Sequence, residues 1–512
     1  MTTTSPVVIG IDSSTTACKA VAFTADGSAV AEARRSYPRS NPHPGWQEQD
    51  PREWWAALAG ALAELTGLLA DHDLEPIALS ITHQRETFVC LDGHGQPLRP
   101  AILWLDTRAG EQIKRLGSAE VHRLSGKPPS TTPSLYKLAW IAQHEPEVLA
   151  NTAVVHEVHG YLVELLTGQR VTSWATADPM SLMNLADFTW SDSLIEMAGL
   201  RRDQLPDLVA PGQVIGTVTT RAAAATGLPA GLPVVAGAGD GQCAGLGAAV
   251  HTGGNAYINL GTGITLGAHT DEYLTASAFR TLASPIAGAY TAEALLSSGA
   301  LSIAWFRDAL SGLPVGAGSR EKQLEALARH VPAGAGGVLY LPYLTSAESP
   351  WWDADARACF VGLSDTDGTA QMYRAVLEGL AHEERLTLDL VEKAVGQPIQ
   401  RVVAMGGASR SVLFTQILAD ILERDVAIST EVETTALGAA VLGAAAVGFT
   451  GTHDVAATAE QMSGVDTVIS PRPDDLDRYR TAHEAYRQLY PALKGIFPTL
   501  AALRRQSGPA AQ

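Results

Sequence analysis

A single carboxylate with glycines on both sides is the feature of this chain best suited to chemistry. Asp240 lies in the run Gly-Ala-Gly-Asp-Gly-Gln at 237–242, where no bulky neighbour shields it. A strand-like run at 256–260 then breaks at the Gly-Thr-Gly turn 261–263. Glycines let backbone N–H groups approach an anion closely, and Thr262 adds a hydroxyl donor. A base near a phosphate cradle is what phosphoryl transfer to an alcohol requires.

The N-terminus repeats this arrangement. Val7–Ile11 is an apolar, β-branched run typical of a buried strand, and Asp12 follows it at the start of the hydroxyl-rich segment 13–16. A returning strand is predicted at Lys19–Phe23. In that turn Asp12 could bind a metal ion. Taken alone, each segment is equally well an ordinary hairpin with a polar turn, because one such turn does not define a ligand site.

Two further segments have polar residues where a strand-like run ends. Arg85 offers a rigid donor fork and Glu86 an acceptor, a pairing suited to sugar hydroxyls, although a surface salt bridge is the simpler alternative. Trp104 could cover the apolar face of a sugar or could pack in a core. Gly406 and Gly407 end a predicted strand just before a helix, which suits a phosphate or an adenosine but also suits a plain turn.

Six segments together resemble the FGGY family of carbohydrate kinases, within the actin/Hsp70/hexokinase fold group. The resemblance extends from Val7 to about Tyr490. The segments occur in the family's order: 9–16, 43–55, 81–87 with 102–108, 237–240, 261–263, and 405–410 with 436–440. It implies an α/β chain with a two-lobed, actin-like ATPase (ribonuclease H-like) fold and a central cleft.

The resemblance also implies a reaction and the residues that perform it. It implies ATP-dependent phosphorylation of a sugar, a pentulose such as D-xylulose becoming D-xylulose 5-phosphate, with Mg²⁺ as the metal. Asp240 would be the catalytic base. The other implied roles are substrate binding for Arg85, Glu86, Trp104, Asp106, Asp240 and Gln242; nucleotide binding for Ser14, Thr15, Thr16, Lys19, Gly261, Thr262, Gly263, Gly406, Gly407 and Ser411; and metal binding for Asp12 and Asp240.

Three departures from the family pattern leave the substrate open. Segment 81–87 is closer to glycerol kinases than to most xylulokinases, Leu105 stands where the family has asparagine, and segment 346–350 lacks an arginine found in many pentulose kinases. The acceptor could therefore be another sugar or polyol: glycerol, ribulose, erythritol or gluconate. A non-sugar ATPase would share both phosphate hairpins without needing Arg85 or Glu86. A catalytically silent sugar-binding regulator would not need Asp240.

Composition narrows the class of protein. A chain of 512 residues should form more than one domain. The net charge of −18 argues against a nucleic-acid partner. Since no apolar run reaches about 18 residues, we expect no membrane span. Four widely spaced cysteines and an N-terminus without signal features favour a cytoplasmic protein. A homodimer is one assembly that the sequence allows.

The sequence divides into two lobes of similar size. We expect a first lobe at 1–246, a second at 247–490 and a tail at 491–512. Helices are predicted near 54–70, 301–311, 369–395 and from Ser409, and strands at 77–81, 88–91, 233–236 and 401–405. His382, Glu383 and Glu384 lack the second histidine of a zinc helix, so a solvated helix face is predicted there.

Overall fold

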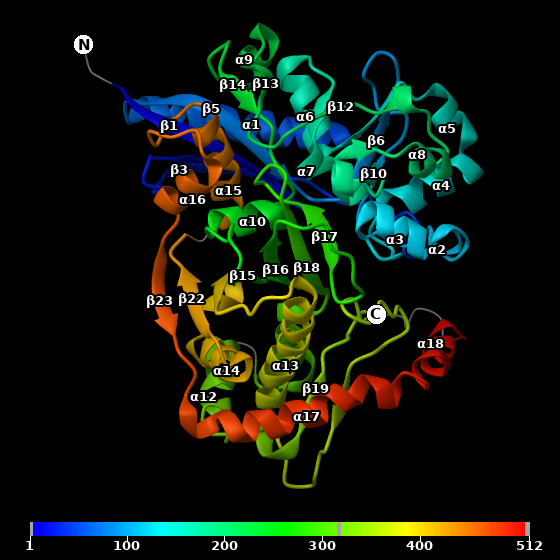
Figure 1. The fold of residues 1–512 in the computed structure, drawn as a ribbon, viewed down its shortest axis with the longest axis vertical. Helices are drawn as coiled ribbons and strands as arrows, with labels where there is room; N and C mark the ends of the chain where they lie inside the picture. The colour runs from blue at the N-terminus through cyan, green and yellow to red at the C-terminus, as the bar shows by residue number, and fades with distance from the viewer. Residues whose placement is uncertain (1–3, 315–318, 432, 507–512) are drawn as a thin grey trace.

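The computed structural model describes residues 4–314, 319–431 and 433–506. Two lobes lie one above the other along the long axis of the molecule (Figure 1). Each lobe has one large β-sheet at its centre. Residues 507–512 of the predicted tail lie outside the described part of the chain.

The first sheet holds the N-terminal hairpin. Its six strands are, in order, β13 (Val214–Thr217), β14 (Pro233–Val235), β5 (Leu74–His83), β1 (Ser5–Ser13), β2 (Ala17–Phe23) and β3 (Ala29–Ser36). β1 is antiparallel to β2 and parallel to β5, and β5 is parallel to β14. The predicted N-terminal hairpin is confirmed, with Asp12 opposite Lys19.

The second sheet repeats this plan. Its seven strands are, in order, β17 (Arg280–Ala283), β18 (Tyr290–Leu296), β16 (Ile264–Thr270), β15 (Asn255–Leu260), β21 (Arg401–Met405), β22 (Asp425–Ser429) and β23 (Val465–Ile469). β15 is antiparallel to β16 and parallel to β21, which is parallel to β22. The second predicted hairpin is therefore also confirmed, and its turn at 261–263 is the counterpart of the turn at 13–16.

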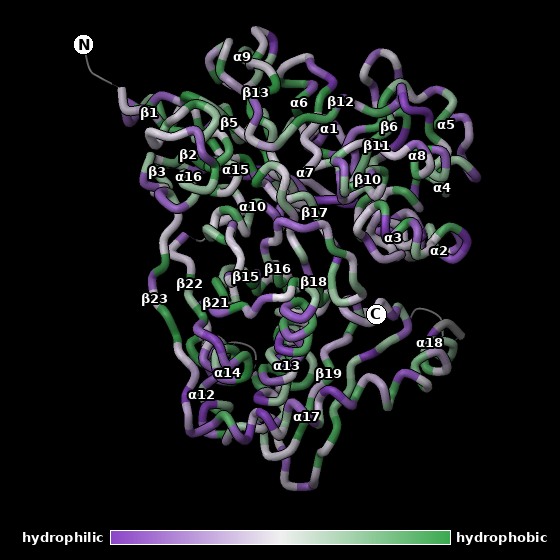
Figure 2. Tube along the Cα trace, viewed as in Figure 1, coloured by the Kyte–Doolittle hydropathy of each residue, from purple (hydrophilic) through white to green (hydrophobic). Residues whose placement is uncertain are grey.

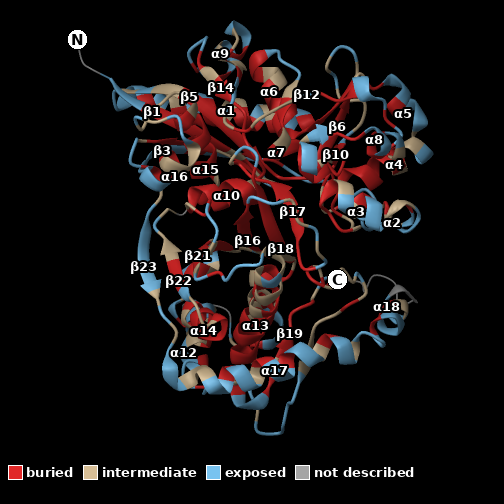
Figure 3. Ribbon diagram, viewed as in Figure 1, coloured by how far each residue is buried: buried red, intermediate tan, exposed pale blue. Residues whose placement is uncertain are grey.

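Helices cover both sheets. Asp50 caps the N-terminus of α1 (Pro51–Asp71), because its carboxylate accepts a hydrogen bond from the N–H of Arg52. The buried face of α1 packs on the first sheet. The second lobe contains α11 (Gly299–Trp305), α12 (Arg320–Ala328), α13 (Thr369–Val395), α14 (Val412–Leu422), α17 (Leu476–Leu493) and α18 (Phe497–Gln506). Hydrophilic residues are frequent along the outer helix α17 (Figure 2), whereas the central strands are buried (Figure 3). None of the helices in the described ranges is both long and apolar enough to cross a bilayer.

A smaller unit extends the first lobe beside the main sheet. Its strands are β4 (Glu48–Gln49), β7 (Ala101–Ile102), β6 (Phe88–Leu91) and β8 (Val154–Glu157). Its helices are α2 (Gly110–Leu116), α3 (Ala119–Ser125), α4 (Ser134–His144), α5 (Pro146–Asn151), α6 (Val158–Thr167), α7 (Trp174–Ala177) and α8 (Asp192–Met197). Most of these helices and strands share an apolar core of their own. α6 is the exception, because its buried residues pack in the core of the main sheet.

Two helices pack closely where the lobes meet. A Cβ added to Gly438 of α15 (Thr434–Ala446) would lie 1.9 Å from the carbonyl oxygen of Cys243 in α10 (Asp240–Gly247). A Cβ added to Gly10 of β1 would lie 1.9 Å from the carbonyl oxygen of Ala436. Only glycine permits such approaches. α15 therefore lies against the first sheet and shares a core with it, although the chain then returns through β23 to the second sheet.

The predicted solvated face of α13 is wrong. His382 and Glu383 have no exposed surface, and Glu384 is also buried. α17 and α14 cover this helix from two sides, so a charged face has no solvent to meet. Glu383 accepts hydrogen bonds from the hydroxyls of Tyr343 and Tyr486 at 2.8 and 2.6 Å. The residue pattern along α13 does not show that other helices pack over its charged face.

Glu384→Gln should stabilise the protein at alkaline pH. Burial raises the pKa of Glu384 well above its usual range, and the charge of Glu383 adds to the effect. A carboxyl group whose folded pKa is raised contributes stability below its unfolded pKa and loses it as the pH rises. Glutamine should therefore increase the free energy of unfolding at pH 8, where burial disfavours the charged form of Glu384.

Thermal unfolding at pH 8 and pH 5 measures this effect. The gain should shrink at pH 5, where the unfolded glutamate is also partly protonated. Glu484→Gln on the exposed side of α17 is the matched control and should change little. Equal melting temperatures for Glu384→Gln and the wild type at pH 8 would contradict the prediction.

Candidate active site

The predicted site loops follow the carboxyl ends of parallel strands, where ligand sites of open α/β sheets form. In the first sheet, β1 ends at Ser13 and β5 ends at His83, which forms a parallel bridge with Gly239. In the second sheet, β15 ends at Leu260 beside β21, which ends at Met405. The loop before Asp240 is thus placed beside the first hairpin, and the glycines after β21 are placed beside the second.

Asp240 is the first residue of α10, and its side chain is 40% exposed. Its Oδ1 lies 2.7 Å from Nε of Arg85 and accepts the N–H of Gly241 at 2.7 Å. The structure therefore brings together the predicted base and the predicted sugar-binding arginine. One carboxylate oxygen is engaged by the protein, while the group as a whole remains accessible.

The glycines beside Asp240 are required by packing. A Cβ on Gly239 would lie 2.6 Å from Cγ and Cδ of Arg85. A Cβ on Gly241 would lie 2.4 Å from Oε2 of Glu293. Both distances are far shorter than a carbon contact tolerates. These glycines let the Arg85 and Glu293 side chains lie directly against the start of α10.

Asp12 has the properties of a cation ligand. Its Oδ1 is buried and has no hydrogen-bond partner among the described residues. Burial, with the negative charges of Asp240 and Glu433, raises the pKa of Asp12 to about 7 against the opposing effect of Lys19. Lys19 itself is 2.5 Å from Glu433. A buried carboxylate oxygen without a partner suits a hard divalent cation, which prefers oxygen ligands. The described residues contain no group of three or more His, Cys, Asp or Glu side chains placed to hold a metal, so protein ligands other than Asp12 are not indicated.

The first turn is closed by its own hydroxyl groups. Ser14 Oγ donates to the carbonyl of Ala17 at 3.0 Å, and Thr15 Oγ1 accepts the indole N–H of Trp104 at 3.0 Å. Thr16 is exposed. The predicted roles of Ser14, Thr15, Thr16 and Lys19 in binding phosphate remain predictions. Trp104 reaches this turn, which places the predicted sugar-covering ring beside the predicted phosphate site.

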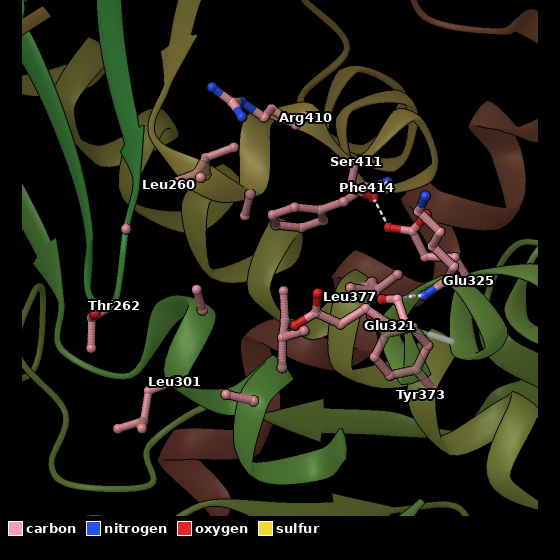
Figure 4. A pocket seen from close by; sticks show the side chains of 18 residues that line it. Leu260, Thr262, Leu301, Glu321, Glu325, Tyr373, Leu377, Arg410, Ser411 and Phe414 are labelled. Carbon is pink, nitrogen blue, oxygen red and sulfur yellow. Dashed lines mark hydrogen bonds between the residues drawn. The ribbon is translucent and has the colours of Figure 1, made fainter. Parts of the chain in front are cut away.

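The second turn borders a cavity of about 800 Å³ in the second lobe (Figure 4). Gly261, Thr262, Gly407 and Ser411 all line it, so the structure brings together these four predicted nucleotide-binding residues. The remaining lining residues are Leu260, Ala300, Leu301, Ile303, Ala304, Ser319, Glu321, Lys322, Glu325, Tyr373, Leu377, Ala408, Arg410 and Phe414. Its wall is largely apolar and also carries two acidic and two basic side chains, a lining typical of a small-molecule site.

Two details of this cavity differ from the sequence-based expectation. A short 3₁₀ turn at Gly407–Arg410 precedes α14, which begins at Val412 rather than Ser409. Ser411 caps α14 by accepting the N–H of Phe414 and donates to Glu325 at 2.5 Å. Gly263 and Gly406 belong to the same loops but are not among the cavity's lining residues.

The remaining predicted sugar-binding residues are buried in hydrogen bonds. The Asp106 carboxylate accepts hydrogen bonds from the backbone N–H of Gln47 at 2.6 Å and from two side-chain nitrogens of Arg108. Gln242 Nε2 donates to the carbonyl of Ala175 at 2.9 Å. Both side chains have at most 1% of their surface exposed, so this conformation supports positioning roles for them. Their contact with a substrate remains a prediction.

Sequence reasoning missed the charged residues behind the site. Arg280 and Glu293 lie on β17 and β18, and Lys127 pairs with Asp178 at 2.6 Å. All four side chains are buried. The one available signal was a charged residue inside each of two short apolar runs, at 279–283 and 290–296. A buried charge in a strand needs a partner, and the sequence does not reveal which residue that partner is.

Comparison with known proteins gives matches over almost the whole chain. The model for the N-terminal domain of the FGGY family of carbohydrate kinases matches residues 7–247, and that for its C-terminal domain matches residues 256–447. A xylulose kinase of Staphylococcus epidermidis is 28% identical over 96% of this chain and 97% of its own. A glycerol kinase of Alkalilimnicola ehrlichii is 31% identical over 92% and 94%. The crystal structure of a gluconate kinase from Lactobacillus acidophilus superimposes with a TM-score of 0.90 at 25% identity, covering 97% of this chain and 99% of that one.

Proposed function

This chain belongs to the FGGY family of carbohydrate kinases, and we propose that it transfers the γ-phosphoryl group of ATP to a hydroxyl of an uncharged sugar, with D-xylulose as the first candidate. The predicted family and two-lobed actin-like fold are both confirmed by these similarities. The relatives carry three different substrate names, xylulose, glycerol and gluconate. The choice among them depends on this chain's own site.

One observation carries the proposal: the accessible carboxylate of Asp240, which lies 2.7 Å from Arg85 at the start of α10. Asp240 accepts the proton of the attacking hydroxyl. Arg85 is placed to hold a neighbouring oxygen of the sugar by a charge-assisted hydrogen bond. Because phosphoryl transfer passes through a loose transition state, placing the two reactants and excluding water matter more than the strength of the base.

The residues present also fit a divalent cation. Asp12, with its unpaired Oδ1 and a pKa raised by burial and by Asp240, would hold Mg²⁺. Mg²⁺ prefers such oxygen ligands and keeps much of its own water. When bound, it neutralises charge on the transferred phosphoryl group. The exposed hydroxyl of Thr16 and the cavity wall at Thr262 would contact the nucleotide from the two lobes.

The charge balance favours an uncharged acceptor. The ion pairs around Asp240 in the described residues are Arg85 with Asp240 and Glu293, Arg280 with Glu86 and Glu293, and Lys127 with Asp178, three cations against four carboxylates. Lys137 is buried, and burial lowers its pKa to about 7. The carboxylate of gluconate would find Arg85, Arg280 and Lys127 already paired with carboxylates, and Lys137 only partly charged at neutral pH, so ketopentoses and small polyols fit better.

Measuring ADP release over a panel of acceptors tests the proposal. The panel is D-xylulose, D-ribulose, glycerol, erythritol and D-gluconate, each supplied with ATP and Mg²⁺. We expect an uncharged sugar to give the highest kcat/KM and D-gluconate to give at least about tenfold less. Release of ADP at the same rate without any acceptor would identify a non-sugar ATPase. Sugar binding without ADP release would identify a silent regulator, and a preference for D-gluconate would refute the charge argument.

A further inference from the structure

Two of the predicted sugar-binding residues, Arg85 and Glu86 of the first lobe, are held by side chains of the second. Arg85 Nη1 donates to Glu293 at 3.0 and 3.1 Å, and Arg280 Nη1 donates to Glu86 at 2.6 Å. Arg280 Nε also donates to Glu293 at 2.9 Å. The result is a continuous series of alternating charges, Glu86, Arg280, Glu293, Arg85 and Asp240, that crosses from one lobe to the other.

Glu293 is the centre of this series. Its side chain has no exposed surface. Burial alone would raise its pKa, but Arg85 and Arg280 outweigh that effect and lower the pKa to about 2. The hydroxyl of Tyr257 donates to its second oxygen at 2.9 Å. Glu293 is therefore a permanent anion with both oxygens engaged, which suits a group that fixes the orientation of its partners.

The second-lobe strand that carries Arg280 is docked on the first lobe by backbone contacts. The N–H of Thr281 donates to the carbonyl of Gly126 at 2.8 Å, and the N–H of Ala283 donates to Asp178 at 3.1 Å. β17 is thereby anchored to the first lobe on either side of Leu282. The docking fixes where Arg280 and its neighbour Glu293 stand relative to Glu86 and Arg85.

We propose that Arg280 and Glu293 are positioning residues for the sugar, so that the acceptor site of the first lobe is complete only when β17 and β18 are docked against it. This inference rests on the proposed function in one respect, that the ligand beside Arg85 is a sugar. No second-lobe side chain in this role needs to touch the substrate. Each one acts through Arg85 or Glu86.

The arrangement solves a problem of competing charges. Arg85 lies 2.7 Å from Asp240, the carboxylate that accepts the hydroxyl proton. A guanidinium with Asp240 as its sole partner would close onto it as a two-point ion pair, blocking both groups. Glu293 instead binds Arg85 at Nη1 while Asp240 lies at Nε, so the guanidinium is held from two directions. Arg280 in turn holds Glu293 and Glu86 apart, since two buried carboxylates without a cation between them repel.

The test compares kinetic constants for the two substrates in four variants. Glu293→Gln, Arg280→Gln and Arg280→Lys are measured against Arg85→Ala, with the best acceptor of the panel as the probe. Asp420→Asn is the matched control, because Asp420 is another fully buried carboxylate of the second lobe that pairs with an arginine, Arg472. Near-ultraviolet circular dichroism and melting temperature establish which variants are folded.

We expect Arg85→Ala, Glu293→Gln and both Arg280 variants to raise KM for the sugar about tenfold or more, and to leave KM for ATP within about threefold. Arg280→Lys keeps the charge but cannot reach Glu86 and Glu293 with one ammonium, so it should not restore the wild-type KM. If Glu293→Gln does not fold, the KM values of Arg280→Lys alone test the inference. Asp420→Asn should lower stability without separating the two KM values.

Three results would overturn the inference. Equal increases in both KM values would mean that the series only stabilises the fold. A wild-type KM in Arg280→Lys would mean that only charge is needed. An unchanged KM for the sugar in folded Glu293→Gln would remove the positioning role while leaving the kinase activity intact. A wild-type enzyme that releases no ADP with any sugar would instead refute the proposed function itself.

Discussion

Replacing Asp240 with asparagine is expected to lower kcat by about 10²- to 10⁴-fold, while KM for ATP stays within about threefold. A positioned general base contributes an acceleration of that size, and asparagine keeps the shape of the side chain without its basicity. Asp240 begins α10 on the first lobe, whereas the 800 Å³ cavity is lined by second-lobe residues. The change should therefore affect the chemical step much more than nucleotide binding.

Steady-state kinetics with saturating sugar measures this loss. Asp71→Asn, an exposed change at the end of α1, is the control and should leave kcat unaltered. A kcat within about threefold of the wild type in Asp240→Asn would remove Asp240 from the mechanism. A parallel rise in KM for ATP would mean that Asp240 acts mainly through the metal.

Replacing Asp12 with asparagine is expected to stabilise the metal-free protein at pH 8 and to reduce kcat about a hundredfold or more. Burial and the charges of Asp240 and Glu433 raise the pKa of Asp12 to about 7. The group therefore favours folding at low pH, and this contribution is lost as the pH rises through 7. Asparagine removes the repulsion. It would also remove the proposed ligand to Mg²⁺, an ion whose charge neutralisation is worth several kcal/mol in a transition state.

Melting curves with and without Mg²⁺ and ATP separate the two effects. Without ligands at pH 8, Asp12→Asn should melt above the wild type, and at pH 5 this difference should be smaller. With Mg²⁺ and ATP, the wild type should gain more, because a ligand stabilises the folded state in proportion to its affinity. A variant that melts below the wild type under all conditions would mean that Asp12 is a structural residue.

The two hairpins could be predicted from sequence because their signals are local. A β-branched run followed by Asp12 or by Gly-Thr-Gly is contained within a few residues, and both antiparallel pairs are present in the structure. The long helix α13 was predicted with its observed bounds, 369–395, for the same reason. The sequence did not show which helix packs over a given face of α13. His382 lies under α17, whose first residue is almost a hundred positions later.

The series of alternating charges that contains Arg85 could not be predicted from local sequence patterns, because its members are far apart along the chain. Glu293 and Arg85 are separated by 208 positions, and Arg280 and Glu86 by 194. No periodicity relates residues so far apart. The glycines around Asp240 were noticed, but for their exposure; their reason is the close approach of Arg85 and Glu293. The same limit applies to Asp106, whose partner Arg108 is near in sequence but whose burial depends on the loop that contains Gln47.

The position of α15 has a consequence for how this protein could be divided. The match to the family's first domain ends at residue 247, yet the core of the first lobe contains Ala436, Leu437 and Ala440 from α15. A fragment cut at that boundary would leave the apolar face of β1 and β5 uncovered, a surface prone to aggregation. The two halves should therefore be poorly behaved when expressed separately and should recover when produced together. The first lobe therefore depends on a helix from the other half of the chain for a complete core.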